Sequence, residues 1–204
     1  MKRLSLGLRF RSQRAERNKL PFGIPANIRL AQISGVSVID RAVTFAPDDW
    51  HNIERFRPRI LVGHAGSLKR LSEQVHRGIL NLDSVNHAVF VLTTCGESPL
   101  SDTLRVLLWQ SFGVPVYEVV VAGDGTLLAT DCEAEEGWHL QPGVHARLIG
   151  RELHFEMPGV RALCTGLAAV INSEPCACGR STFRINGMER LRGPAAVQGL
   201  AATA

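Results

Sequence analysis

The chain has 204 residues, of which 45% are hydrophobic and 21% are charged. This balance is typical of a soluble globular protein and excludes an intrinsically disordered chain, and the length suffices to bury a core without disulfide bonds. Stretches free of charged residues reach only about a dozen residues, short of the roughly 18 to 20 that a membrane-spanning helix requires, so we expect no membrane contact.

The positive charge is concentrated at the beginning of the chain. Residues 1–19 carry a net charge of +6, which leaves −2 for the other 185 residues. We expect residues 1–34 to form a basic N-terminal arm or helix, either solvated or in contact with RNA or an acidic partner. This segment lacks the apolar core and cleavage site of a secretory signal, so a cytoplasmic location is expected.

Residues 35–125 show the pattern of an α/β layer. Helical segments are predicted at residues 47–55, around Leu68, Leu71 and Val75 up to a cap at Gly78, and from Ser98–Pro99 to Gly113. Strands joined by intervening helices pair in parallel through crossover connections. The predicted strands are residues 59–62, 87–92 and 114–121.

Residues 126–190 lose the helical period and contain short alternating runs typical of β-hairpins. The predicted strands are residues 126–130, 144–148, 152–155 and 167–171. Residues 191–204 are small and almost uncharged, and we expect a flexible tail there. The fold class predicted is therefore α/β, with a partly parallel βαβ layer followed by a β-rich region.

Five cysteines occur in a chain without a secretory signal, so reduced thiols are expected. Two pairs stand out, Cys132 with His139 and Cys176 with Cys178. Three thiolates and one imidazole can hold a structural zinc ion in a tetrahedron, and glycines beside both pairs permit the necessary turns. On spacing alone, small buried cysteines and a surface histidine explain the pattern equally well. Cys164 lacks a partner in the pattern and is predicted to be a buried thiol.

The order of these motifs resembles part of the phenylacetate-CoA ligase branch of the adenylate-forming enzymes. The resemblance covers residues 35–186. It rests on the segments RFRPRILVGHAGSLKRLSEQV, VFVLTTCGESPLSDTLRVLLWQSFGVPVYE, DCEAEEGWHL and EPCACGRSTFRI. In members of this branch the last two segments bind zinc, which implies a zinc-hairpin region with Cys132, His139, Cys176 and Cys178 as ligands.

The same resemblance implies ATP with Mg²⁺ and CoA as cofactors, but several of the family's nucleotide residues differ here. No glycine-rich Ser/Thr phosphate loop is visible in residues 1–34. Gly123 and Asp124 stand where the family has Thr and Glu, and Leu167 stands where its ribose-binding Asp belongs. The chain also ends before the family's C-terminal lid, whose lysine has no counterpart after Lys69. The resemblance thus implies a truncated adenylate-forming core without that lid.

A residual ligand pocket is expected where the parallel strands end, because crevices of open α/β sheets lie there. Cys95 is not expected to be catalytic, since no base is aligned with it, and no catalytic residues are assigned. The candidate pocket residues are His64, Cys95, Gly96, Glu97, Tyr117, Gly123, Asp124 and Gly125.

Three functions are compatible with this sequence. The first is a zinc-stabilised relative of acyl- or aryl-CoA ligases that does not adenylate by itself and instead binds a protein partner, a second copy or a small aryl or acyl group. The second is one half of a split acyl-CoA or aryl-CoA ligase, completed by another chain. The third is an RNA or acidic-partner binder acting through residues 1–19. The shortage of aromatic residues for base stacking disfavours it.

Overall fold

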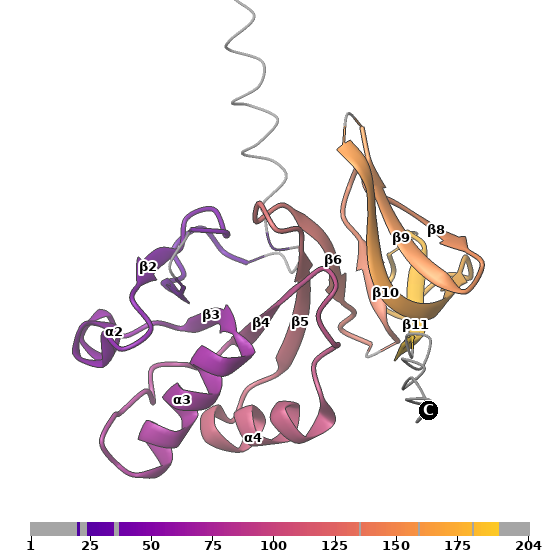
Figure 1. The fold of residues 1–204 in the computed structure, drawn as a ribbon. Coiled ribbons are helices and arrows are strands. Elements are labelled where there is room, and N and C mark those ends of the chain that lie inside the picture. Colours follow the sequence, from indigo (N-terminus) through magenta and orange to yellow (C-terminus); the bar gives the residue numbers. More distant parts are fainter. Residues whose placement is uncertain are drawn as a thin grey trace, which may run out of the picture.

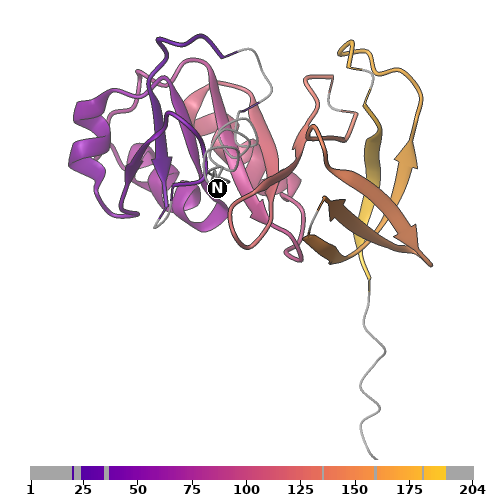
Figure 2. The same cartoon turned by 90° about the horizontal axis from the view of Figure 1, so that it is seen from above.

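A computed structural model describes residue 20 and residues 24–34, 37–134, 136–158, 160–180 and 182–191. Of the predicted basic arm (residues 1–34), residues 1–19 and 21–23 lie outside these residues, as does the predicted tail (residues 191–204) apart from residue 191. Within the described chain the strands form one sheet of mixed direction, in the order β2-β1-β3-β4-β5-β6-β7-β11-β10-β9-β8. Figures 1 and 2 show that the helices accompany the first half of this sheet and that the second half is built from strands.

The first half is an α/β layer in which neighbouring strands run parallel, as predicted. Strand β1 pairs with β2 and β3, β3 pairs with β4, and β4 pairs with β5. Its elements are β1 (Leu30–Ile33), β2 (Val43–Phe45), α2 (Trp50–Phe56), β3 (Ile60–His64), α3 (Ala65–His76), β4 (Ala88–Thr94), α4 (Asp102–Phe112) and β5 (Val116–Val121).

Helices α3 and α4 lie side by side on one face of the parallel strands (Figure 1). Leu68 and Leu71 of α3 and Leu108 of α4 are fully buried there against Val89 and Val91 of β4. Burying such side chains contributes about 1.5–3 kcal/mol each, so this apolar face fixes how the helices dock.

The helix C-termini follow the prediction, but two helices begin later than predicted, since α2 begins at Trp50 and not at residue 47. Gly78 and Gly113 adopt left-handed backbone angles after α3 and α4, as predicted. Helix α4, however, begins three residues later than the Ser98–Pro99 signal indicated. Its N-cap is Ser101, whose hydroxyl accepts a hydrogen bond from the Leu104 amide at 3.3 Å, the interaction that makes serine favourable at a helix start.

Strand β1 was not predicted, and it lies within the range expected to form the basic arm. Its four residues are all buried. They include one polar residue, Gln32, whose side chain is satisfied by hydrogen bonds. The Gln32 Oε1 atom accepts hydrogen bonds from the Val38 and Ile39 amides at 3.0 and 2.8 Å. The sheet therefore begins before residue 35.

The second half continues the sheet with antiparallel strands. A separate cluster of buried apolar side chains, including Trp138, Phe155 and Leu167, forms its core. The strands are β6 (Leu127–Asp131), β7 (Trp138–Leu140), β8 (His145–Ile149), β9 (Glu152–Met157), β10 (Val160–Asn172) and β11 (Arg184–Arg190).

A buried carboxylate joins the two halves. Glu118 of β5 is 2% exposed and accepts hydrogen bonds from the Thr93 hydroxyl, the Leu100 amide and the Trp138 indole N–H at 2.5, 2.7 and 3.1 Å. Burial raises the pKa of Glu118 above its ordinary value, although these hydrogen bonds oppose the increase. Because Trp138 belongs to β7, this network fixes β7 against the parallel sheet.

Candidate metal centre

The first pair of ligand candidates comes from the turn between β6 and β7. Cys132 follows β6 directly and His139 is the middle residue of β7. The Cys132 amide donates to the Gly137 carbonyl at 3.0 Å, which closes the turn. Gly137 has φ +108°, and a Cβ there would lie 2.4 Å from the Ile185 carbonyl oxygen. Only glycine can therefore bring this turn so close to β11.

The second pair comes from the connection between β10 and β11. Cys176 and Cys178 lie in a tight turn that Gly179 completes with φ +81°, donating its amide to the Cys176 carbonyl at 2.9 Å. Arg184 of β11 is in register with His139 of β7. This antiparallel pairing places the cysteine turn beside His139.

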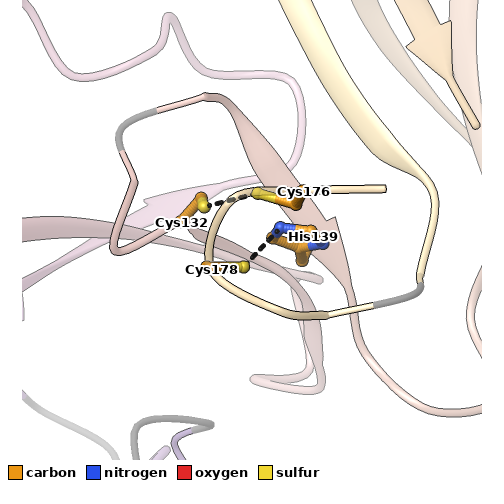
Figure 3. A group of neighbouring side chains, drawn as sticks. All are labelled: Cys132, His139, Cys176 and Cys178. Atoms are coloured by element: carbon orange, nitrogen blue, oxygen red, sulfur yellow. Dashed lines mark hydrogen bonds between the residues drawn. The ribbon is translucent and has the colours of Figure 1, made fainter. Parts of the chain in front are cut away.

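The four side chains meet as the sequence predicted (Figure 3). Their sulfur and ring nitrogen atoms all lie within 4.8 Å of one another, with 3.2 Å between the sulfurs of Cys132 and Cys176 and 3.4 Å between the Cys178 sulfur and His139 Nε2. A disulfide bond would need about 2.05 Å. Ligands in tetrahedral contact with one zinc ion are about 3.5–3.8 Å apart, which these distances approach.

Neighbouring groups hold the ligands in place. The Thr182 hydroxyl lies 2.9 Å from His139 Nδ1, which leaves Nε2 to face the sulfurs. Glu136 contacts both the Cys176 thiol and the Arg184 guanidinium. Such contacts fix ligand orientation in metal sites. Neither Glu136 nor Thr182 was predicted, because nothing in their spacing distinguishes them from other polar turn residues.

Burial and neighbouring groups shift the pKa values of three of the four side chains. Burial and the nearby positive charge of Arg180 lower the pKa of His139, so the imidazole is neutral and able to coordinate. Burial alone would raise the pKa of Cys178, but the Arg180 amide, the other two thiols and the Arg180 charge lower it. Burial raises the pKa of Cys176 to about 12. The Cys176 thiol therefore keeps its proton unless a cation binds beside it. The residues present, three thiols and one imidazole, fit a metal ion.

The predicted pocket residues do not all come together. His64 ends β3, Cys95–Glu97 form the turn after β4, and Gly123–Gly125 form the turn after β5. These residues therefore follow the ends of three neighbouring parallel strands. Tyr117 instead lies near the beginning of β5, where its ring stacks on Phe90 with 5.6 Å between centroids. It lines cavities beside α4.

The surroundings of Cys95 are not those of a reactive thiol, and Cys164 is not a buried thiol. Burial and the neighbouring Cys164 raise the pKa of Cys95 to about 11, which disfavours the nucleophilic thiolate. Cys164 is exposed, not buried as predicted. It lies opposite His154 in the antiparallel β9–β10 pair, next to an irregular part of that ladder.

Comparison with solved structures shows where this fold occurs. The chain is similar to 2-hydroxyisobutyryl-CoA ligase, solved with 2-HIB-AMP and CoA in the thioesterification state, at 13% identity over 88% of this chain and 46% of that one (TM-score 0.64). The chain has the fold of part of an adenylate-forming CoA ligase.

Two further ligases have the same fold. One is the anthranilate CoA ligase in complex with anthranoyl-AMP, at 11% identity over 86% of this chain and 42% of that one (TM-score 0.58). The other is a long-chain-fatty-acid-CoA ligase from Archaeoglobus fulgidus, at 9% identity over 86% of this chain and 46% of that one (TM-score 0.59). This chain spans less than half the length of these ligases.

No protein-family model matches the sequence, and no curated protein matches it. The solved structures described above confirm the predicted fold of adenylate-forming ligases, while the phenylacetate branch stays a prediction. Among the described residues, every helix is too short or too polar to cross a membrane.

Proposed function

We propose that this chain is a zinc-stabilised relative of phenylacetate-CoA ligase-like enzymes that acts as a binding or partner protein and does not adenylate acids by itself. Cys132, His139, Cys176 and Cys178 would hold the zinc ion. Four protein ligands leave no open position for water or substrate, so the ion would link the two turns and take no part in a reaction.

Leu167 is the observation that carries the proposal. The resemblance aligns Leu167 with the Asp that binds ribose in the family, yet this side chain is 3% exposed and belongs to the apolar core of the β-rich half. A leucine in that core cannot accept hydrogen bonds from ribose hydroxyls. Without that acceptor, the site lacks one of the fixed groups with which such an enzyme would hold a nucleotide.

Asp124, the counterpart of the Glu in the family's nucleotide motif, already has a structural role. Its Oδ1 atom accepts a hydrogen bond from the Thr126 amide at 3.0 Å, which shapes the turn between β5 and β6. A carboxylate engaged in its own turn is less available to hold a magnesium ion beside a phosphate.

An apolar cavity beside α4 supports binding of a small aryl or acyl group. The cavity has a volume of about 300 Å³ and is lined by Trp109, Val106, Pro115 and Tyr117 among others. Trp109 and Val106 are more than half exposed, at 57% and 51%. Cavities of this size lined by aromatic side chains suit small aromatic ligands.

Two measurements on the purified chain test this function. Calorimetric titration with ATP and AMP should show no saturable binding, and pyrophosphate exchange with a panel of aryl and acyl acids should stay at the background rate. Elemental analysis should find zinc near one equivalent or more. Formation of an acyl-adenylate by this chain alone, lost in the Asp124→Asn variant, would contradict the proposal.

A split acyl-CoA or aryl-CoA ligase is the second candidate, because the chain matches only 42–46% of each solved ligase reported above. A second chain would then supply the phosphate loop and the lid. Co-purification with such a chain and CoA-dependent thioester formation by the mixture would favour this candidate over the first. No exchange activity in the mixture would exclude it.

A further inference from the structure

A second group of metal-ligand side chains lies on β9 and β10 and shares no residue with the centre described above. Glu152 and His154 are two residues apart on β9, so they project from the same face of the strand. Cys164 of β10 is in register with His154. A carboxylate, an imidazole and a thiol therefore lie together on one face of an antiparallel pair.

The distances between these donors match those of a metal site. His154 Nε2 lies 3.7 Å from the Cys164 sulfur and 3.5 Å from Glu152 Oε2, and the three ligand atoms lie within 4.8 Å of one another. Three ligands at bonding distance from one zinc ion are separated by about 3.3–3.8 Å. Binding an ion would thus require little rearrangement.

The surrounding backbone holds this group in position. The β9–β10 register shifts between Cys164 and Ala168, where Gly166 adopts φ +67°. The Gly166 amide donates to Glu152 Oε1 at 2.8 Å, so the other carboxylate oxygen faces His154. Bulges of this kind commonly direct side chains towards functional sites.

The three side chains differ in burial, as expected for a metal site that is open to solvent on one side. The His154 side chain is 9% exposed and that of Glu152 is 30% exposed, whereas Cys164 is exposed. An ion could therefore enter from the cysteine side and contact the imidazole behind it.

We propose that Glu152, His154 and Cys164 form a second site for a late first-row transition-metal ion such as Zn²⁺ or Co²⁺. One thiolate and one carboxylate balance the charge of a divalent ion, and a mixed sulfur, nitrogen and oxygen set selects such metals over Mg²⁺ or Ca²⁺. Three protein ligands leave a fourth position for water or a small ligand, unlike the closed four-ligand centre.

The site adjoins the α/β half of the molecule. The Cys95 sulfur lies 3.8 Å from the Cys164 carbonyl oxygen, and Cys95 belongs to the turn after β4. A ligand on the open metal position would thus bind next to the strand ends of the parallel sheet.

Metal stoichiometry of defined variants tests the second site. The full chain is loaded with Zn²⁺ or Co²⁺, freed of excess metal and analysed for metal content, and the Co²⁺ form is also measured by thiolate-to-cobalt absorption. We expect about two equivalents in the unmodified chain and about one in His154→Asn and Cys164→Ser, with Mg²⁺ giving none. The one equivalent of metal that these variants should retain, bound by the four-residue centre, would also show that the rest of the chain is folded.

Two matched controls remove similar side chains from β8 and β9. His145→Asn removes a histidine from neighbouring β8, and Glu156→Gln removes a carboxylate from the same face of β9 as Glu152. Both should keep about two equivalents. Equal metal content in the unmodified chain and in His154→Asn would overturn the second site.

The outcome is independent of the zinc centre proposed above. The Cys178→Ser variant should lose only the equivalent bound by that centre. If the chain binds a single equivalent that His154→Asn loses and Cys178→Ser keeps, the second site stands and the first centre fails.

Discussion

If Cys132, His139, Cys176 and Cys178 hold a metal ion as proposed, removing the ion should destabilise the β-rich half while its strands remain formed. The sharpest perturbation is Cys178→Ser. Cys178 is only partly buried, so the loss of its sulfur contacts adds little to the loss of metal coordination. Chelation of the unmodified chain should produce the same effect, since both remove the link between the two turns.

The magnitude follows from the chain segment that the metal closes. Cys132 and Cys176 are 44 positions apart. In the chain-entropy model, a cross-link that closes a loop of this length stabilises the folded state by about 4 kcal/mol at 25 °C. For a protein of about 200 residues, each kcal/mol shifts the melting temperature by about 2–4 °C, so we expect a decrease of about 8–16 °C.

Thermal unfolding followed by circular dichroism measures this shift, with and without a strong zinc chelator. The unmodified chain and Cys95→Ser should both respond to the chelator, because Cys95 lies outside the centre. Cys178→Ser should melt at the lower temperature and respond much less. Excess Zn²⁺ should restore the unmodified chain. A melting temperature that chelation leaves unchanged, in a sample holding under about a tenth of an equivalent of zinc, would refute the reasoning.

Two further predictions concern the residues around β7. Gly137→Ala should lower the free energy of unfolding by at least about 1–3 kcal/mol and weaken metal binding, because the new Cβ would lie 2.4 Å from the Ile185 carbonyl oxygen. Gly143 also has positive φ, but open space surrounds the position of its Cβ. Gly143→Ala should therefore lower the free energy of unfolding less, as measured by chemical denaturation, and should leave metal binding unchanged. Burial raises the pKa of Glu118 above 4.5, so the folded state binds the Glu118 proton more tightly than the unfolded state does. The stability contributed by protonated Glu118 is therefore lost as the pH rises through the raised pKa. Glu118→Gln should remove this pH dependence from denaturation curves and cost about 1–3 kcal/mol, since an amide nitrogen cannot accept the Trp138 indole N–H; an unchanged pH profile would contradict the assignment.

The parallel layer was predictable because its signals are local. Leu68, Leu71 and Val75 recur at helical spacing, and Gly78 and Gly113 mark where the helices end. Strand β1 escaped prediction because its four residues follow a strongly basic segment, and because Gln32 interrupts the apolar run. Its burial depends on hydrogen bonds from Val38 and Ile39, which no local pattern reveals.

The gathering of Cys132, His139, Cys176 and Cys178 was also predictable, because these residues form two short pairs beside glycines. The second group was not, although Glu152 and His154 have the alternate spacing of one strand face. Cys164 joins them only through the β9–β10 register. Which strands pair, and in what register, depends on contacts between distant segments, so spacing alone predicted a buried and isolated thiol.

Strand β7 explains how a metal ion in one half of the molecule can affect the other half. Its three residues are all buried, and successive side chains point to opposite faces. Trp138 donates its indole N–H to Glu118 of the parallel sheet at 3.1 Å, whereas His139 faces the cysteine sulfurs. The register of β7 against β11 positions both side chains, so a shift of β7 that moved His139 away from the cysteine sulfurs would also move Trp138 away from Glu118. A metal ion held by these four side chains would therefore stabilise the junction between the halves as well as the turns that carry the ligands.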